Sequence, residues 1–528
     1  MIPENVEEEE DKIMTFKRNT LRVLGTTLCF AGLVGATGCE AGIEGEEEAV
    51  GEAKDAITDV AHTPVERQSI GNCWLYAEAT WVESMNLSFV QAHAQSGGGA
   101  IGHTCANLFC EEGETDTPLA PGCMPAETDH AACLAAVCEE DSYCCETDWD
   151  DICVKHVEES EYAGCNPSLC EAPPAGDEPA PEIEELDVSQ SYWTYWHWFD
   201  EITGFFHGDE IQTGGNTWTS HGIIRDRGVM KELDFVPEDS DGEMSNRQSA
   251  ALNKINNELK NGALKTQDAR RDGKLVRQIM DEAWGLSDEV RAQLDQVFGE
   301  DGEMTLRSGS SLEGTNIVHP NDVPVRYAVK SGGEVTYKDT NLSEALSEWD
   351  TVRYPSSASS ARSSLKRVQQ ALHASQPVVI TWDVEFNAME NGNNERRGSF
   401  NKETLDLAGK PGRQGGHMTV LEDYAAITSA FGLLEAGVTL DPNNAEDAAK
   451  LDAALADDTE ITLLRTKNSW GGARPDRAFA EGFPGYHDLW MDYLNGPIKW
   501  CPSQDNPTND NCRGESRPLR SYMLPPGF

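Results

Sequence analysis

Ten of the chain's 15 cysteines lie within residues 105–170, and this block limits how the chain can fold more than any other feature. An even number of closely spaced cysteines is typical of disulfide bonds formed in an oxidising compartment. A zinc site fits less well, because such sites favour Cys-x-x-Cys pairs and the block has none. We therefore expect a disulfide-rich module whose connectivity the spacing leaves open. Its candidate disulfide cysteines are Cys105, Cys110, Cys123, Cys133, Cys138, Cys144, Cys145, Cys153, Cys165 and Cys170.

The amino-terminal segment predicts the export that disulfide bonds require. Residues 14–39 begin with basic side chains and continue with an apolar stretch that is too short to cross a bilayer, which is typical of a signal peptide. The stretch ends in small residues directly before Cys39, as in a lipobox, so we expect lipidation of Cys39. The acidic residues 1–13 suit a start codon assigned upstream of the true one. The expected location is the cell envelope, lipid-anchored on its periplasmic or cell-surface side, with plain secretion as the alternative.

Composition excludes one class of partner. The chain is 38% hydrophobic and 25% charged, which is typical of a globular protein, and its net charge is −51. Such a surface repels phosphate backbones, so we expect no nucleic-acid partner. Membrane contact is expected only through the lipid anchor.

Composition and periodicity divide the chain into consecutive segments. Helical patterns precede strand-like runs at 376–384, 416–427 and 461–470, which indicates an α+β fold. A helix is expected from Cys73 to about His93. The segments are a signal peptide with lipobox (1–39), an acidic tether (40–62), the first part of a catalytic domain (63–97), a cysteine-rich insertion with its linker (98–185), the remainder of that domain (186–500) and a C-terminal tail (501–528).

One cysteine has no obvious partner. Cys29 and Cys39 belong to the signal region, and Cys501 and Cys512 are close enough to pair, which leaves Cys73 over. At a helix amino terminus the macrodipole favours the thiolate of Cys73, which is the nucleophilic form.

Such a thiolate needs a histidine, and the histidine needs a polar group to orient it. His417 begins an apolar strand after Gly415 and Gly416, and Asn468 ends a later strand. These residue types and positions predict a Cys–His–Asn site.

Three motifs carry a family resemblance. The stretches QSIGNCWLYA, GGHMTVL and KNSWGG resemble the active-site motifs of papain-superfamily cysteine peptidases, in the same chain order. Residues 189–202, 214–238 and 376–384 are similar to the bleomycin hydrolase and aminopeptidase C branch. The resemblance covers most of residues 63–495 outside the cysteine-rich block. It implies a papain-like two-lobed fold, with a helical left lobe and a β-barrel-like right lobe, into which the disulfide-rich module is inserted.

The resemblance also implies roles for individual residues. Cys73 would be the nucleophile, His417 the general base and acid, and Asn468 the group that orients His417. Trp470 would shield the hydrogen bond between His417 and Asn468 from water.

Three further residues would contact the substrate. Gln68 would donate its side-chain amide to the oxyanion, alongside the backbone N–H of Cys73. The spacing of five between Gln68 and Cys73 is one shorter than the family usually shows. Gly214 and Gly215 match glycines whose backbone pairs with an extended substrate.

The resulting expectation is an exported thiol-dependent peptidase that cleaves peptide or protein substrates through a thioester and needs no metal or organic cofactor. In the resembled branch the carboxyl terminus lies in the cleft and favours removal of amino-terminal residues. Residues 520–528 are apolar enough to do the same, so aminopeptidase and endopeptidase activity are both open, as is the oligomeric state. The alternatives are a catalytically silent surface-binding lipoprotein and an acyltransferase with the same triad.

Overall fold

The computed structural model describes residues 60, 63–96, 186–204, 208–240, 244–392, 396–472, 484–501, 512 and 514–528. The signal peptide, Cys39, nearly all of the tether and the ten cysteines of the 105–170 block lie outside the described residues. In the part that is described, no helix is long and apolar enough to cross a membrane. The described elements are mostly helices in the first half and an antiparallel sheet in the second, which confirms the α+β class.

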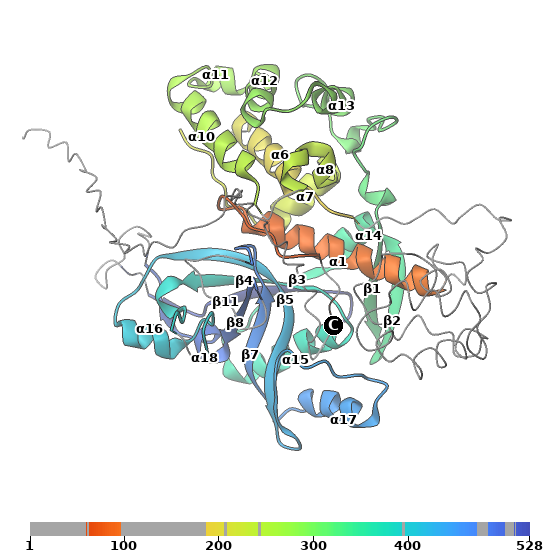
Figure 1. Ribbon diagram of the computed structural model, residues 1–528, viewed down its shortest axis with the longest axis vertical. Coiled ribbons are helices and arrows are strands. Elements are labelled where there is room, and N and C mark those ends of the chain that lie inside the picture. The colour runs from red at the N-terminus through yellow and green to blue at the C-terminus, as the bar shows by residue number, and fades with distance from the viewer. Residues whose placement is uncertain are drawn as a thin grey trace, which may run out of the picture. The chain divides into compact units, whose positions relative to one another are not determined.

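A group of helices lies on one side of the long first helix (Figure 1). The expected helix from Cys73 is α1, and the helical pattern at 246–298 corresponds to four helices, α10 to α13. The helices of this part are α1 (Cys73–Ser96), α6 (Gln190–Thr203), α7 (Thr217–Arg227), α8 (Glu232–Phe235), α9 (Pro237–Ser240), α10 (Asn246–Asn261), α11 (Gln267–Arg270), α12 (Gly273–Trp284) and α13 (Asp288–Phe298).

Side-chain caps explain where these helices begin. A Ser, Asn or Asp precedes each of the longer helices after α1, and its side-chain oxygen accepts a backbone N–H of the first turn, which would otherwise lack a partner. The caps are Ser189 for α6, Asn216 for α7, Ser245 for α10, Asp272 for α12 and Ser287 for α13.

Aromatic side chains fill the core between these helices, which we call the helical core. Trp193, Trp196 and Trp198 of α6 are fully buried there, together with Trp81 of α1 and Trp284 of α12. The tryptophan-rich run of α6 therefore packs the interior and does not form an exposed platform.

The second half forms a seven-stranded antiparallel sheet with strand order β3-β11-β4-β5-β7-β8, and β6 pairs with β5. A separate hairpin joins β1 and β2. The strands are β1 (Pro324–Ser331), β2 (Glu334–Asn341), β3 (Asp350–Arg353), β4 (Val378–Glu385), β5 (Gln414–Thr428), β6 (Gly432–Leu434), β7 (Glu460–Lys467), β8 (Tyr486–Trp490), β9 (Ile498–Lys499), β10 (Glu515–Ser516) and β11 (Leu519–Leu524). The helices of this half are α14 (Leu342–Glu348), α15 (Ala358–His373), α16 (Lys402–Ala408), α17 (Ala445–Ala454) and α18 (Met491–Leu494).

The central strands are buried on both faces. Alternate side chains of a strand point to opposite sides, and Val379 and Val420 join the helical core. Val378, Ile380 and Leu421 point the other way, into a second cluster that includes residues of α15 and that we call the sheet core. Since α1 contacts β5 on the first face (Figure 1), the sheet holds the start of α1 against the start of β5.

The carboxyl-terminal segment differs from the expected tail. Residues 519–524 form β11, which pairs with β3 on one side and with β4 on the other. Phe528 is buried, its backbone oxygen accepts a hydrogen bond from the Arg367 guanidinium, and Lys330 lies 5.6 Å from its ring centre. The expectation that this segment returns to the cleft is therefore wrong, because its apolar side chains complete the sheet core instead.

A disulfide bond joins Cys501 and Cys512, as their proximity in the sequence predicts. Among the described residues, Cys73 is the free cysteine, and its side chain is buried.

We predict that β11 is essential for folding. Deleting residues 519–528 leaves β3 and β4 without their common partner, so we expect loss of the cooperative unfolding transition in urea. Phe528→Ala removes one buried ring and should lower the free energy of unfolding by about 3 kcal/mol. The control Leu407→Ala alters an exposed side chain and should change it by less than about 0.5 kcal/mol. A deletion variant that unfolds with the wild-type midpoint would contradict this prediction.

Candidate active site

A hydrogen bond joins the predicted histidine and asparagine. His417 lies on β5 and Asn468 directly follows β7, and these two strands are neighbours in the sheet. The Nε2 atom of His417 is 2.8 Å from Oδ1 of Asn468, and both side chains are buried. An amide oxygen only accepts hydrogen bonds, so Nε2 carries the proton. The neutral imidazole then has its lone pair on Nδ1, where it can act as a base.

Tryptophan rings enclose this hydrogen bond. The Trp470 ring stacks on His417 with 4.9 Å between ring centres and 15° between planes. Trp382, the cross-strand partner of His417, meets the imidazole edge-on at 5.5 Å. Phe386 stacks in turn on Trp470. Trp470 thus lies on the ring whose hydrogen bond to Asn468 it is expected to shield.

The thiol lies beside the residue that follows the histidine. Cys73 is the first residue of α1. The backbone N–H of Met418 on β5 donates a hydrogen bond to the Cys73 sulfur, which favours the thiolate. Packing of α1 on β5 therefore places Cys73 beside Met418, the residue that follows His417 in the sequence.

Burial keeps both groups neutral at rest. It raises the pKa of the Cys73 thiol to about 11, in spite of the favourable backbone N–H groups of Met418 and Trp74. It also lowers the pKa of His417 to about 4, although the hydrogen bond that His417 donates to Asn468 acts in the opposite direction. Burial therefore opposes the effect of the helix macrodipole on the pKa of the Cys73 thiol.

Gln68 reaches the site from the segment before α1. Its backbone N–H donates to the carbonyl of Ser469 at 2.9 Å, and its side-chain oxygen accepts from the Ser469 hydroxyl at 2.6 Å. Its amide nitrogen donates to the carbonyl of Ile70 at 2.6 Å. Gln68 therefore lies beside Ser469, the residue after Asn468, and Ile70 accepts one of the two hydrogens of its amide.

The two predicted glycines have different surroundings. A Cβ atom on Gly215 would lie 2.4 Å from the indole of Trp74, whereas a Cβ atom on Gly214 would meet nothing within 4 Å. The indole N–H of Trp74 donates to the carbonyl of Thr213 at 3.0 Å. Trp74 thereby fixes this loop beside Cys73, with the Gly214 backbone exposed.

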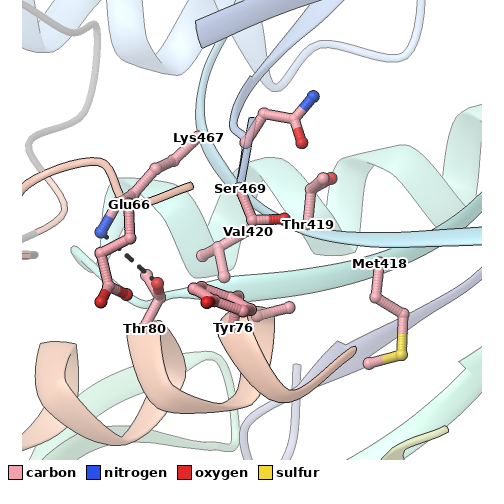
Figure 2. A pocket seen from close by; sticks show the side chains of 10 residues that line it. Glu66, Tyr76, Thr80, Met418, Thr419, Val420, Lys467 and Ser469 are labelled. Carbon is pink, nitrogen blue, oxygen red and sulfur yellow. Dashed lines mark hydrogen bonds between the residues drawn. The ribbon is translucent and has the colours of Figure 1, made fainter. Parts of the chain in front are cut away.

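A small pocket beside the site contains charged groups that sequence reasoning missed. Figure 2 shows Glu66, Tyr76, Thr80 and Lys467 around it, and Asn468 also lines it. The Lys467 ammonium donates to the carbonyl of Thr63 at 2.6 Å and lies 3.4 Å from the Thr80 hydroxyl.

Burial explains the electrostatics of this pocket. It raises the pKa of Glu66 and of Glu83, and it lowers the pKa of Lys467 in spite of these acidic neighbours. Lys467, the last residue of β7, thus connects the strand that precedes Asn468 to α1. Little in the sequence pointed to this role, because the same strand also contains Glu460 and Arg465.

Comparison with known proteins identifies one segment. Residues 103–168 match a domain of unknown function, DUF8252, and this match lies inside the segment 98–185 that we expected as an insertion. No curated protein matches the chain.

We predict that reactivity of the Cys73 thiol depends on His417. In His417→Phe the ring is kept but the proton acceptor is lost, so thiolate forms only as pH approaches about 11. Alkylation by iodoacetamide should then rise about tenfold per pH unit through the alkaline range. At pH 7 the variant should react at least about tenfold more slowly than the wild type.

A matched control is His373→Phe. Burial also lowers the pKa of His373 to about 4, but its partner is Tyr424, farther along β5. This variant should alkylate at the wild-type rate. If the alkylation rate of His417→Phe already reaches a plateau below pH 8, burial does not hold the Cys73 thiol neutral.

Proposed function

We propose that this chain is an exported, thiol-dependent peptidase with a papain-like two-lobed fold that hydrolyses peptide bonds through a Cys–His–Asn site. The observation that carries the proposal is the imidazole of His417, which is oriented by Asn468 and enclosed by Trp470, on the strand whose next residue, Met418, contacts the Cys73 sulfur. The three sequence motifs that resemble those of papain-superfamily peptidases contain Cys73, His417 and Asn468.

The chemistry follows from the proton positions. Cys73 Sγ attacks the substrate carbonyl carbon while its proton moves to Nδ1 of His417, and the carbonyl oxygen becomes an oxyanion. The backbone N–H of Cys73 and the amide of Gln68 would donate to that oxyanion. The imidazolium then protonates the leaving amine as the C–N bond breaks, which leaves a thioester on Cys73. Water, deprotonated by His417, attacks the thioester and restores the thiol.

The position of the carboxyl-terminal segment bears on specificity. Because β11 and Phe528 pack into the sheet core, the reason to expect a carboxylate in the cleft no longer holds. We therefore propose internal cleavage of extended peptides, with the exposed backbone at Gly214 as the pairing edge. Export, lipidation of Cys39 and attachment to the cell envelope remain parts of the proposal.

Peptide hydrolysis tests the function. We predict that Cys73→Ala loses activity by about four orders of magnitude or more, and that Asn468→Ala retains more activity than Cys73→Ala because the asparagine only orients the base. An epoxide inhibitor of thiol peptidases should modify the wild type at residue 73. Amino-blocked and unblocked reporters distinguish endopeptidase from aminopeptidase activity. Unchanged turnover in Cys73→Ala refutes the proposal, and product that forms only with an added amine identifies an acyltransferase.

The two glycines provide a second prediction. Gly214→Ala places a methyl group in open space, so the thermal midpoint should change little while KM for peptides rises several-fold. Gly215→Ala forces the Trp74 indole to move, so it should lower both the midpoint and kcat. Equal effects of the two substitutions on KM and midpoint would contradict the assignment of the substrate edge to Gly214.

A further inference from the structure

We propose that Gln248, on helix α10, is a positioning residue that holds Cys73 and its backbone N–H in place; this role rests on the peptidase function proposed above. Gln248 is fully buried and comes from the helices α10–α13, which none of the three active-site motifs includes.

The Gln248 amide forms hydrogen bonds with residues on both sides of Cys73 in the sequence. Its oxygen accepts from the side-chain nitrogen of Asn72 at 3.0 Å. Its nitrogen lies 3.3 Å from the Tyr76 hydroxyl and 3.1 Å from the Ser191 hydroxyl. One side chain thus connects the residue before Cys73 with the residue one turn after it.

The second hydrogen of the Asn72 side-chain amide also has an acceptor. Its side-chain nitrogen also donates to the Thr194 hydroxyl at 3.0 Å, and Thr194 donates to the carbonyl of Gln190 at 2.7 Å. The carbonyl of Asn72 accepts from the N–H of Leu75 at 2.9 Å. The peptide group between Asn72 and Cys73 is therefore fixed, and its N–H is the proposed oxyanion donor.

Gln248 is itself anchored by the same network. The Ser245 hydroxyl accepts its backbone N–H at 3.3 Å, and the Ser191 hydroxyl donates to Asp239 at 2.6 Å. Ser191, Asp239 and Ser245 are all buried. An apolar side chain would fill the space of Gln248 without fixing a direction, whereas the Gln248 amide, whose oxygen and nitrogen both have partners, permits one arrangement. Orientation of the nucleophile is what this network supplies, since a misplacement of about 1 Å can cost roughly 100-fold in rate.

The test compares two buried glutamines. Gln248→Leu should slow iodoacetamide alkylation of Cys73 at pH 7 about tenfold and shift its pH profile toward the alkaline range. It should lower kcat for peptides by a similar factor, with KM unchanged within about twofold. The control is Gln293→Leu on α13, where the side-chain oxygen accepts the N–H of Asn316 at 2.7 Å. It loses a comparable hydrogen bond and should keep the wild-type alkylation profile.

A second variant covers the case in which Gln248→Leu does not fold. Thr194→Val keeps the side-chain shape but removes the other acceptor of Asn72, so the same slowing of alkylation is expected. The proposal is overturned if folded Gln248→Leu or Thr194→Val alkylates like the wild type, or if Gln293→Leu slows equally. Failure of the wild type to cleave peptides, with the alkylation differences intact, would reject the peptidase function and leave the positioning role standing.

Discussion

Burial of α1 on every side is the constraint on which the rest of the structure depends. Residues 73–86 are buried, so each polar side chain among them requires a partner inside the protein. Glu83 accepts the backbone N–H of Val188, and Asn86 accepts that of Leu186. The chain that resumes after the segment 98–185 is thereby bound along the helix that precedes it. Because the chain leaves from α1 and is bound to α1 again where it resumes, an insertion between these points can be accommodated without disturbing the core.

Much of this fold is predictable because its signals are local. The stripe of Trp74, Trp81 and Met85 predicts a buried helix, and the apolar runs predict β4, β5 and β7. The strand β11 was missed because its pairing with β3 and β4 is non-local, and a short apolar terminus gives no sign of the partners that it will meet. The prediction assigned residues 501–528 to a C-terminal tail for that reason.

The residue types at the site were predictable, but their ionisation was not. Chain order and motif place Cys73, His417 and Asn468 together, whereas the degree of burial follows only from the complete packing. The helix macrodipole alone would lower the pKa of the Cys73 thiol. Burial has the opposite and larger effect, so the pKa lies above its ordinary value. Gln248 and Lys467 were missed because a polar residue in a helix or strand pattern is usually assigned to solvent.

A buried thiol would have a consequence in the exported protein that we propose. Thiolate is the form that oxidants attack, so a thiolate held permanently near the surface would be lost in an oxidising compartment. Burial raises the pKa of Cys73 and lowers that of His417, so it penalises the charged form of each group. In the proposed reaction, a substrate carbonyl that accepts the electrons of the sulfur would remove that penalty for the thiolate at the moment of attack. Trp470 and Trp382 pack against His417, and these dry surroundings would strengthen the attraction between the imidazolium and the developing anion.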